Sequence, residues 1–482
     1  MIDTQTIRTR ILHLALQGKL VPQNSSDDSA IDLVSALCKK IKGQSFQNNI
    51  SQQEIPYDIP DSWVWCHLSD IGTTNIGLTY HPEDVSANGT IVARSSNIVN
   101  NKMDYTDLVK VTCPIRDNQF LHTHDILICA RNGSKALVGK CAIFEGSPKT
   151  VAFGAFMAVF RTPLYRFIYY YFNSQVFKRN FFNDESKQIN QVTQNILKKS
   201  LIPIPPIQEQ ERITRKIEQA FSVLDTIDEL QAQYADNLTA LKSKLIDAAI
   251  QGKLTEQLPE DGTAEELIDR IKIEKEALIS SRKIPKEKAL PKINSGDIPF
   301  DIPDNWNWVR VQDVATYITD YVANGSFATL KANTKTYKEK NYALFVRTMD
   351  LSADFKDDCS YIDKKSYDFL KKSRLFGGEL ILPNIGASIG KAFIMPNLGM
   401  PMSLAPNSIM LKFTEPIINS YFSFIIKSSY GYKLLNKTQG GSATAKFSKT
   451  DLRSLIVPIP PLSEIKRIVQ KLEEILPLCE KN

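Results

Sequence analysis

The chain of 482 residues contains two copies of one sequence unit. The phrase IPYDIPDSWVW at residues 55–65 recurs as IPFDIPDNWNW at residues 298–308, and these two phrases hold all four tryptophans. The motif QGKL precedes each phrase, at residues 17–20 and 251–254. Self-similarity of this kind means that any fold of the chain must contain one structural unit twice. A phrase kept in both copies suits a shared framework, so we expect its tryptophans to fix the chain onto a domain or helix surface.

A long helix is predicted in the middle of the chain, directly after the proline motif IPIPP at residues 202–206. From Ile213 onward, apolar side chains recur in steps of four and three residues, which is the heptad pattern of a coiled coil. Pro205 and Pro206 lie where such a helix can begin, and Gly252 lies where it can end. The helix would measure about 68 Å, at 1.5 Å per residue over roughly 45 residues.

The partners of this helix are predicted at the two ends of the chain, where the same apolar steps recur. We expect the central helix to pair antiparallel with an N-terminal and a C-terminal helix, about an approximate two-fold axis. Pro477 should end the last helix near Leu476, which makes the C-terminal arm short. The seam residues are Ile213, Ile217, Leu224, Ile227, Tyr234, Leu238, Leu241 and Leu245 on the central helix, and Ile468, Leu472 and Ile475 near the C-terminus.

The regions between the helical segments are predicted to be globular. Short apolar runs bounded by Gly, Asn and Pro are typical of strands, and an aromatic-rich helical stretch follows them in each region. The fold class is therefore α+β, with two globular domains separated by the coiled coil. The expected boundaries are residues 1–54 for an N-terminal helical segment, 55–206 for the first domain, 207–297 for the central helix and linker, 298–461 for the second domain and 462–482 for the C-terminal helix.

The distribution of charge and the placement of the cysteines indicate what kind of partner the protein binds and in which compartment it folds. The net charge is only +6, but basic residues outnumber acids in two equivalent windows, residues 166–200 and 421–455, which favours an anionic partner such as nucleic acid. Seven scattered cysteines without a Cys-x-x-Cys pair indicate a reducing cytoplasm rather than a disulfide framework. No apolar run reaches the roughly 18 residues that a membrane span needs.

Motifs for catalysis or metal binding are not recognisable. The loops GSKALVGKC at residues 133–141 and GASIGKA at residues 386–392 lack the spacing and the Ser/Thr of a phosphate-binding Walker loop. Cys113, His122, His124 and Cys129 fit no zinc spacing, and we expect no metal site. All five histidines precede residue 125, so the two copies cannot share a histidine-based reaction, and no catalytic residue is predicted.

Four duplicated features, taken in order, carry a family likeness. They are the tryptophan phrases, the loops ARNGSKALVGK and LPNIGASIGK, the motifs IPIPPIQEQERI and VPIPPLSEIKRI, and the QGKL helix ends. The chain resembles the specificity subunits of Type I restriction-modification systems over essentially its full length. One departure is Ser463-Glu464-Ile465 in the second proline motif, where the first has Gln208-Glu209-Gln210; it puts the second helix surface in doubt as a partner site.

The resemblance implies two target recognition domains, each reading one half of a split, asymmetric DNA site, with conserved helices setting the spacing. It implies no catalysis by the chain itself and a cytoplasmic location. Two modification subunits would bring S-adenosylmethionine, and restriction subunits would bring ATP-driven translocation and cleavage with magnesium. The bases recognised do not follow from the sequence.

Candidate DNA-binding residues are basic, amide and hydroxyl side chains in the loops of the two domains, since such groups contact phosphates and base edges. Arg94 and Arg347 occupy equivalent positions, so we expect phosphate contact or fold support from them rather than base recognition. The candidates are Thr79, Tyr80, Arg94, Arg131, Asn132, Lys135, Lys187, Gln188, Asn190 and Gln191 in the first domain, and Arg347, Asn384, Ser388, Lys391, Ser442, Thr444 and Lys446 in the second.

Two other functions stay open at this point. The chain could be a non-catalytic coiled-coil scaffold whose duplicated domains bind protein or another ligand, or a stand-alone DNA enzyme. The basic windows favour a DNA-recognition subunit over the scaffold, and the missing catalytic motifs count against the enzyme.

Overall fold

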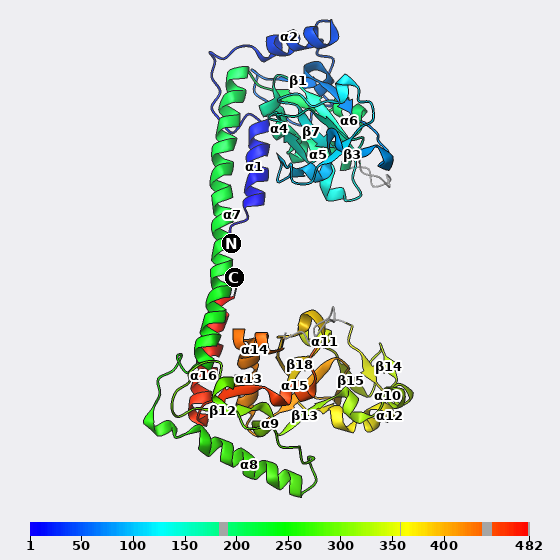
Figure 1. The fold of residues 1–482 in the computed structure, drawn as a ribbon. Coiled ribbons are helices and arrows are strands. Elements are labelled where there is room, and N and C mark those ends of the chain that lie inside the picture. Colours follow the sequence, from blue (N-terminus) through cyan, green and yellow to red (C-terminus); the bar gives the residue numbers. More distant parts are fainter. Residues whose placement is uncertain (183–190, 357, 436–445, 481–482) are drawn as a thin grey trace. The chain divides into compact units, whose positions relative to one another are not determined.

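The computed structural model describes residues 1–182, 191–356, 358–435 and 446–480 (Figure 1). The chain divides into two compact units, residues 1–232 and 233–482. The boundary falls inside the long helix α7, Ile207–Ile250, so that the N-terminal part of α7 belongs to unit 1 and its C-terminal part to unit 2.

Unit 1 is built on a four-stranded sheet with the order β2-β10-β7-β8, in which all neighbours are antiparallel. A second sheet has the order β6-β3-β9, and β1 pairs with β11 to bring the two ends of the domain together. The strands are β1 Val64–His67, β2 Thr73–Ile76, β3 Val85–Ala93, β4 Ile98–Val99, β5 Lys102–Met103, β6 Val109–Val111, β7 Ile126–Cys129, β8 Cys141–Ile143, β9 Val151–Phe153, β10 Met157–Arg161 and β11 Leu201–Ile204.

Helices cover this sheet with aromatic side chains. The core that joins them to the strands includes Phe160, Phe167, Phe172 and Phe177, all of which are buried. The helices of unit 1 are α1 Thr4–Leu16, α2 Ala30–Lys42, α3 Leu68–Ile71, α4 Tyr165–Phe172, α5 Gln175–Phe182 and α6 Gln194–Lys199, together with the start of α7.

Unit 2 repeats the same plan. Its four-stranded sheet has the order β13-β21-β18-β19, and β12 pairs with β22 as β1 pairs with β11. A five-stranded sheet, β14-β16-β15-β20-β17, contains the parallel pair β15–β20, which corresponds to the parallel pair β3–β9 of unit 1. The strands are β12 Asn307–Arg310, β13 Tyr317–Asp320, β14 Thr336–Tyr337, β15 Ala343–Val346, β16 Tyr361–Ile362, β17 Arg374–Leu375, β18 Leu380–Pro383, β19 Phe393–Ile394, β20 Met402–Leu404, β21 Ser408–Lys412 and β22 Ile456–Ile459.

Unit 2 contains several apolar clusters, one of which also takes in Ile246 and Ile250 of α7. As predicted, the last α-helix stops before Pro477, and a 3₁₀ turn, Leu476–Cys479, follows it. The helices are α8 Ala264–Ser280, α9 Val311–Val314, α10 Phe327–Asn333, α11 Thr348–Ser352, α12 Lys364–Phe369, α13 Pro416–Lys427, α14 Ser429–Leu435, α15 Lys449–Ser454 and α16 Leu462–Ile475.

Helix α7 is covered by other parts of the chain at its two ends and is exposed in the middle. Ile213, Ile217 and Leu224 are buried, as are Ile468 and Leu472 of α16. Ile227, Leu238, Leu245 and Ile475 are half-buried.

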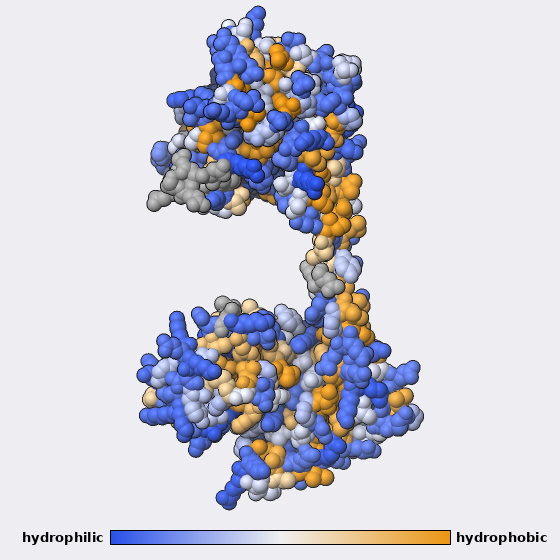
Figure 2. All heavy atoms as spheres, turned by 180° about the vertical axis from the view of Figure 1, so that it is seen from behind, coloured by the Kyte–Doolittle hydropathy of each residue, from blue (hydrophilic) through white to orange (hydrophobic). Residues whose placement is uncertain are grey.

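The predicted apolar seam is wrong at two positions, because Tyr234 is 61% exposed and Leu241 is 47% exposed. The reason is the reach of the chain ends. Polar contacts from the described N-terminal residues extend along α7 to Gln231, and those from the C-terminal residues extend to Lys242. Figure 2 shows apolar side chains along α7, where a purely solvated helix would be polar.

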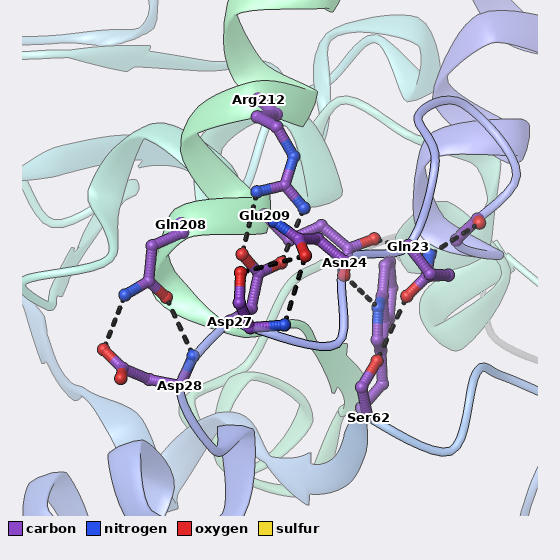
Figure 3. A network of polar contacts seen from close by, with 11 residues as sticks. Gln23, Asn24, Asp27, Asp28, Ser62, Gln208, Glu209 and Arg212 are labelled. Atoms are coloured by element: carbon purple, nitrogen blue, oxygen red, sulfur yellow. Dashed lines mark hydrogen bonds and ion pairs between the residues drawn. The ribbon is translucent and has the colours of Figure 1, made fainter.

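The tryptophan phrase of unit 1 is fixed to the start of α7 by a buried hydrogen bond. The indole Nε1 of Trp63 donates to Oε2 of Glu209 at 3.0 Å, and Nε2 of Gln23 donates to Oε1 of the same carboxylate at 2.7 Å. Burial of Glu209 raises the pKa of its carboxyl, while its two hydrogen bonds act in the opposite direction. Arg212, one turn further along α7, forms a two-pronged ion pair with Asp27, with N–O distances of 3.0 and 2.6 Å (Figure 3).

The same arrangement occurs in unit 2. Trp306 donates to Oε2 of Glu464 at 2.7 Å, Gln257 donates to Oε1 of Glu464 at 2.7 Å, and Arg467 pairs with Asp261. Glu464 therefore has the partners that Glu209 has, and the departure of the second proline motif from the first does not affect this contact. We call each set, Gln23–Trp63–Glu209 and Gln257–Trp306–Glu464, a Trp–Glu junction.

A glycine of each QGKL motif completes each junction. Gly18 has a φ of +68° and Gly252 a φ of +70°, and a Cβ atom added at these positions would lie 2.7 Å from Cδ of Pro60 and 2.6 Å from Cδ of Pro303, respectively. Only glycine combines this left-handed backbone with so close an approach. The expectation that the tryptophans fix the chain onto a helix surface is confirmed for Trp63 and Trp306.

Candidate nucleic-acid interface

Strands β2 and β7 end, and strand β10 begins, at the same edge of the unit 1 sheet, so the loops attached to them lie side by side. Ile76 at the end of β2 pairs with Ala158, and Cys129 at the end of β7 pairs with Met157 at the beginning of β10. The residues that follow β2 and β7 and precede β10 therefore meet. They include the candidates Thr79, Tyr80, Arg131 and Asn132, and also Phe156.

Two further segments join this edge. Gln191 forms an antiparallel bridge with Arg131, and the next amide, of Val192, donates to the carbonyl of Ala130 at 2.8 Å. The side chain of Asn132 donates to Oγ of Ser95 at 3.1 Å, which brings the turn after β3 to the same place. We call the set Thr79, Tyr80, Arg94, Arg131, Asn132, Phe156 and Gln191 the first loop cluster.

The first loop cluster thus assembles candidates from four parts of the sequence. Lys135 lies on the same β7–β8 connection as Asn132, in a 3₁₀ turn at Lys135–Leu137. The candidates Lys187, Gln188 and Asn190 lie outside the described residues, immediately before Gln191.

The most distinctive member of the cluster is Arg131. Its guanidinium lies over the ring of Phe156, with 5.8 Å between Cζ and the ring centroid, and both side chains are exposed. Within the described part of the chain, its guanidinium has no hydrogen bond or ion pair. Sequence reasoning missed Phe156 because it directly precedes the run MAVF and reads as the first residue of a buried strand.

Arg94 and Arg347 are each held by an acidic side chain, that of Arg94 on the β5–β6 connection and that of Arg347 in its own turn. Arg94 donates to Asp107 at 2.8 Å. Arg347 donates through Nη2 to Asp350 and to the carbonyl of Asp358, each at 2.6 Å, and its hydrogen bonds with Asp350 raise the pKa of its guanidinium. These contacts support the turns after β3 and β15, in agreement with the expectation of fold support; a phosphate contact by either arginine stays a prediction.

Unit 2 has an equivalent group of loops at the corresponding sheet edge. Ile385, after β18, forms an antiparallel bridge with Lys446, and the side chain of Asn384 donates to the carbonyl of Phe447 at 3.0 Å. Thr348, next to Arg347, lies within hydrogen-bonding distance of Ser408, with 3.0 Å between their hydroxyl oxygens.

We call Arg347, Asn384, Ile385, Ser388, Lys391, Asn407 and Lys446 the second loop cluster. Ser388 is in a 3₁₀ turn, Gly386–Ser388, on the β18–β19 connection, and Lys391 is exposed on the same connection. The candidates Ser442 and Thr444 lie outside the described residues.

The glycine–lysine loops owe their glycines to packing. Gly139 has a φ of +83°, and an added Cβ would lie 2.6 Å from Cζ of Phe181; Gly390 has a φ of +90°, and its Cβ would lie 2.7 Å from Cδ2 of Tyr432. In both units the loop therefore passes directly over an aromatic ring of a later helix, α5 in unit 1 and α14 in unit 2. The likeness of the two motifs reflects this shared framework.

Residues 1–182, 191–356, 358–435 and 446–480 contain no group of three or more His, Cys, Asp or Glu side chains placed to hold a metal ion. None of the helices in those ranges has the length and apolar character required to cross a lipid bilayer.

Comparison with known proteins gives consistent results. A family model described as the Type I restriction modification DNA specificity domain matches twice, at residues 60–233 and 303–479. The chain is 25% identical to the Type I restriction enzyme EcoAI specificity subunit of Escherichia coli, over 98% of this chain and 89% of the relative. It is 22% identical to the EcoEI specificity subunit of the same species, with the same two coverages.

A solved structure supports the fold. A chain from work described as the structural basis of complex assembly and conformational transition of the type I R-M system matches with a TM-score of 0.56 and 18% identity, over 88% of this chain and 92% of that one. The two matched segments each contain one of the four-stranded sheets and its loop cluster. The chain therefore belongs to the specificity subunits of Type I restriction-modification systems, in which it is the subunit that recognises DNA.

Proposed function

We propose that each unit reads one half of a split, asymmetric DNA site, through its own loop cluster. The observation that carries this proposal is that the same strand order supports two clusters of different chemistry. Equivalent frameworks hold Arg131, Phe156 and Gln191 in unit 1 but Ile385, Asn407 and Lys446 in unit 2. Because base recognition depends on side-chain donors, acceptors and apolar contacts, unlike clusters should prefer unlike bases.

The chain itself would catalyse no reaction. Two modification subunits would bind S-adenosylmethionine and methylate the site, and restriction subunits would supply ATP- and magnesium-dependent translocation and cleavage, with the whole complex in the cytoplasm. The name of the EcoAI relative, a specificity subunit of a restriction enzyme, supports this division of labour, and the seven free cysteines are those of a reducing compartment.

The test of the two-reader proposal is to co-express the chain with its modification subunit and to map methylated adenines across a genome. We expect one split motif. Exchange of residues 55–206 for the equivalent segment of another specificity subunit should change one half of the motif and leave the other half unchanged. A change in both halves would show that the units do not read independently, and the absence of sequence preference would favour a scaffold that binds another ligand.

We further propose that α7 acts as a coiled-coil spacer and that its exposed apolar face binds the modification subunits. Val223, Leu230, Tyr234 and Leu241 are 61%, 58%, 61% and 47% exposed, respectively. They follow one another at steps of seven, four and seven residues, so they lie within about 40° on one face of the helix at 3.6 residues per turn. Exposed apolar stripes of this kind mark protein interaction sites.

This second proposal is tested by changing the apolar face without changing the domains. The double substitution L230D/Y234D should abolish co-purification of the modification subunit while leaving the unfolding temperature almost unchanged, because both side chains are already exposed. The control is T239D, which places the same charge at an exposed position of α7 on the opposite face. Retained co-purification by L230D/Y234D would exclude this face as the binding surface.

A further inference from the structure

One position is held by a similar set of backbone contacts in the two units. In unit 1 the amides of Ala130 and Arg131 both donate to the carbonyl of Phe156, at 2.9 and 3.0 Å. Arg131 then bridges Gln191 on its other side, and the amide of Val192 donates to the carbonyl of Ala130. The backbone of Arg131 is thus held between two neighbouring segments.

Unit 2 repeats three of these four contacts. The amide of Asn384 donates to the carbonyl of Asn407 at 3.1 Å, Ile385 bridges Lys446, and the amide of Phe447 donates to the carbonyl of Asn384 at 3.2 Å. The pattern of bonds equates Arg131 with Ile385, Phe156 with Asn407 and Gln191 with Lys446. The hydrogen-bond framework is similar at this position, although Asn407 has a left-handed backbone with a φ of +69° and Phe156 does not. The side chains differ in all three places.

The contrast with the shared arginines is informative. Arg94 and Arg347 are the same residue in both units, and each forms an ion pair with an acidic side chain of its own unit. Arg131 has no such partner in the described ranges, and its guanidinium is oriented by the exposed ring of Phe156, whose side chain is 60% exposed. A cation held over an aromatic face loses fewer orientations on binding, because it is already ordered before the ligand arrives.

We propose that this position determines one base pair in each half-site, with Arg131 binding a guanine and Ile385 contacting the methyl group of a thymine. The guanidinium fork matches the O6 and N7 acceptors of guanine in the major groove, and an apolar side chain matches the thymine methyl group. Phe156 is a positioning residue that holds the fork of Arg131. The inference rests on the proposed function, because it assigns bases to sites that the two units read.

The experiment measures binding of the complex of this chain with its modification subunit to duplexes that carry the mapped site. Each base pair of the first half-site is replaced in turn, and the affinity of each duplex is compared with that of the mapped site. The wild-type complex should disfavour replacement of one G·C pair by about 10- to 100-fold, the discrimination expected of one bidentate contact. In R131A that discrimination should fall to about one, with all other positions and the second half-site unchanged.

The control for the loss of a positive charge is R116A. Arg116 is exposed like Arg131, but it lies on the β6–β7 connection beside the 3₁₀ turn Asp117–Gln119, outside the first loop cluster. R116A should keep the full discrimination. R131K tests the fork itself, since a lysine keeps the charge but cannot bind two acceptors side by side; it should recover affinity without recovering the full discrimination.

The positioning role of Phe156 is tested with one substitution that removes the aromatic ring and one that keeps it. F156L removes the aromatic face and should lower the discrimination at the same base pair, whereas F156Y keeps the face and should restore it. A merely structural role of the ring would lower the affinity for all duplexes alike, without changing the ratio between them.

The equivalence of the two units is tested by transferring three side chains of unit 2 to unit 1. The triple variant R131I/F156N/Q191K gives unit 1 the three side chains of unit 2, and it should shift the preference at that one pair from G·C to T·A. Position 407 of unit 2 holds an asparagine at the equivalent place in the hydrogen-bond pattern.

The outcomes separate this inference from the function on which it rests. If R131A weakens every duplex equally, Arg131 contacts phosphate and the assignment of a base is wrong. If R131A leaves the discrimination at every position intact, Arg131 is not a reader. If the wild-type complex itself shows no sequence preference, the two-reader function fails, and the inference fails with it.

Discussion

The close approach of Gly18 to Pro60 predicts a specific loss of stability that can be worked out from the structure. Substitution of Gly18 by alanine has two effects. The first is conformational, since a left-handed backbone at φ +68° costs an L-residue about 1 kcal/mol. The second is steric, because the new Cβ would lie 2.7 Å from Cδ of Pro60 and 3.2 Å from Cζ2 of Trp63. Overpacking of this kind typically costs about 1–3 kcal/mol.

Gly43 provides a matched control within the same unit. It has a φ of +71° at the end of α2, and an added Cβ there meets nothing within 4 Å. G43A therefore carries only the conformational effect, and both variants share the entropy that alanine removes from the unfolded chain. The free energy of unfolding of G18A should be lower than that of G43A by about 1–3 kcal/mol.

Native-state hydrogen exchange is a suitable assay, because peptides that cover β1 and β2 report on unit 1 alone, whereas bulk unfolding combines both units. G252A, whose Cβ would lie 2.6 Å from Cδ of Pro303, should lower protection in unit 2 instead. If G18A and G43A are equally stable to within about 0.5 kcal/mol, the close approach of QGKL to the tryptophan phrase does not stabilise the fold, and the reasoning is refuted.

Three further predictions concern the polar contacts of the framework. W63F removes one donor from the buried carboxylate of Glu209, and it should lower the free energy of unfolding by about 1.5–3 kcal/mol, measured by urea titration. R347K replaces a forked contact with Asp350, whose side chain is 3% exposed, by a single ammonium, so we expect a loss of about 1–2 kcal/mol and a lower unfolding temperature. The hydrogen bonds from Arg212 lower the pKa of Asp27 below its ordinary value of 3.8; their stabilisation is fully present above that pH and is lost as the pH falls through the lowered pKa. D27N should therefore lack this acid-induced loss in a pH series of unfolding midpoints.

The long helix could be predicted from the sequence because its signals are local. Prolines at 205 and 206 precede α7, which begins at Ile207, and Gly252 follows its last residue, Ile250. The heptad spacing of the apolar residues predicted which face of α7 is apolar. They carried no information on how far each end of the chain extends along that face, and for this reason the exposure of Tyr234 was not foreseen.

Contacts between distant segments were beyond the reach of local patterns. Trp63 and Glu209 are separated by 146 residues, and nothing in either neighbourhood specifies the other as its partner. The duplication was the one usable signal, because Glu209 and Glu464 are identical at equivalent positions amid differing neighbours. The duplication could not point to Phe156, because its equivalence to Asn407 is visible only in the hydrogen bonds of the folded backbone and not in the sequence.

The two Trp–Glu junctions also set an order of events during synthesis. The first junction needs residues up to Glu209, whereas the second needs Glu464, which leaves the ribosome 255 residues later. At the usual 5–20 residues per second, this interval lasts roughly 13–50 s. Throughout that time unit 1 can be closed while unit 2 lacks the carboxylate that accepts from Trp306. The nascent chain thus exposes an incomplete second unit until residue 464 has been translated, and a ribosome stalled before that residue would release a chain with one closed reader and one open one.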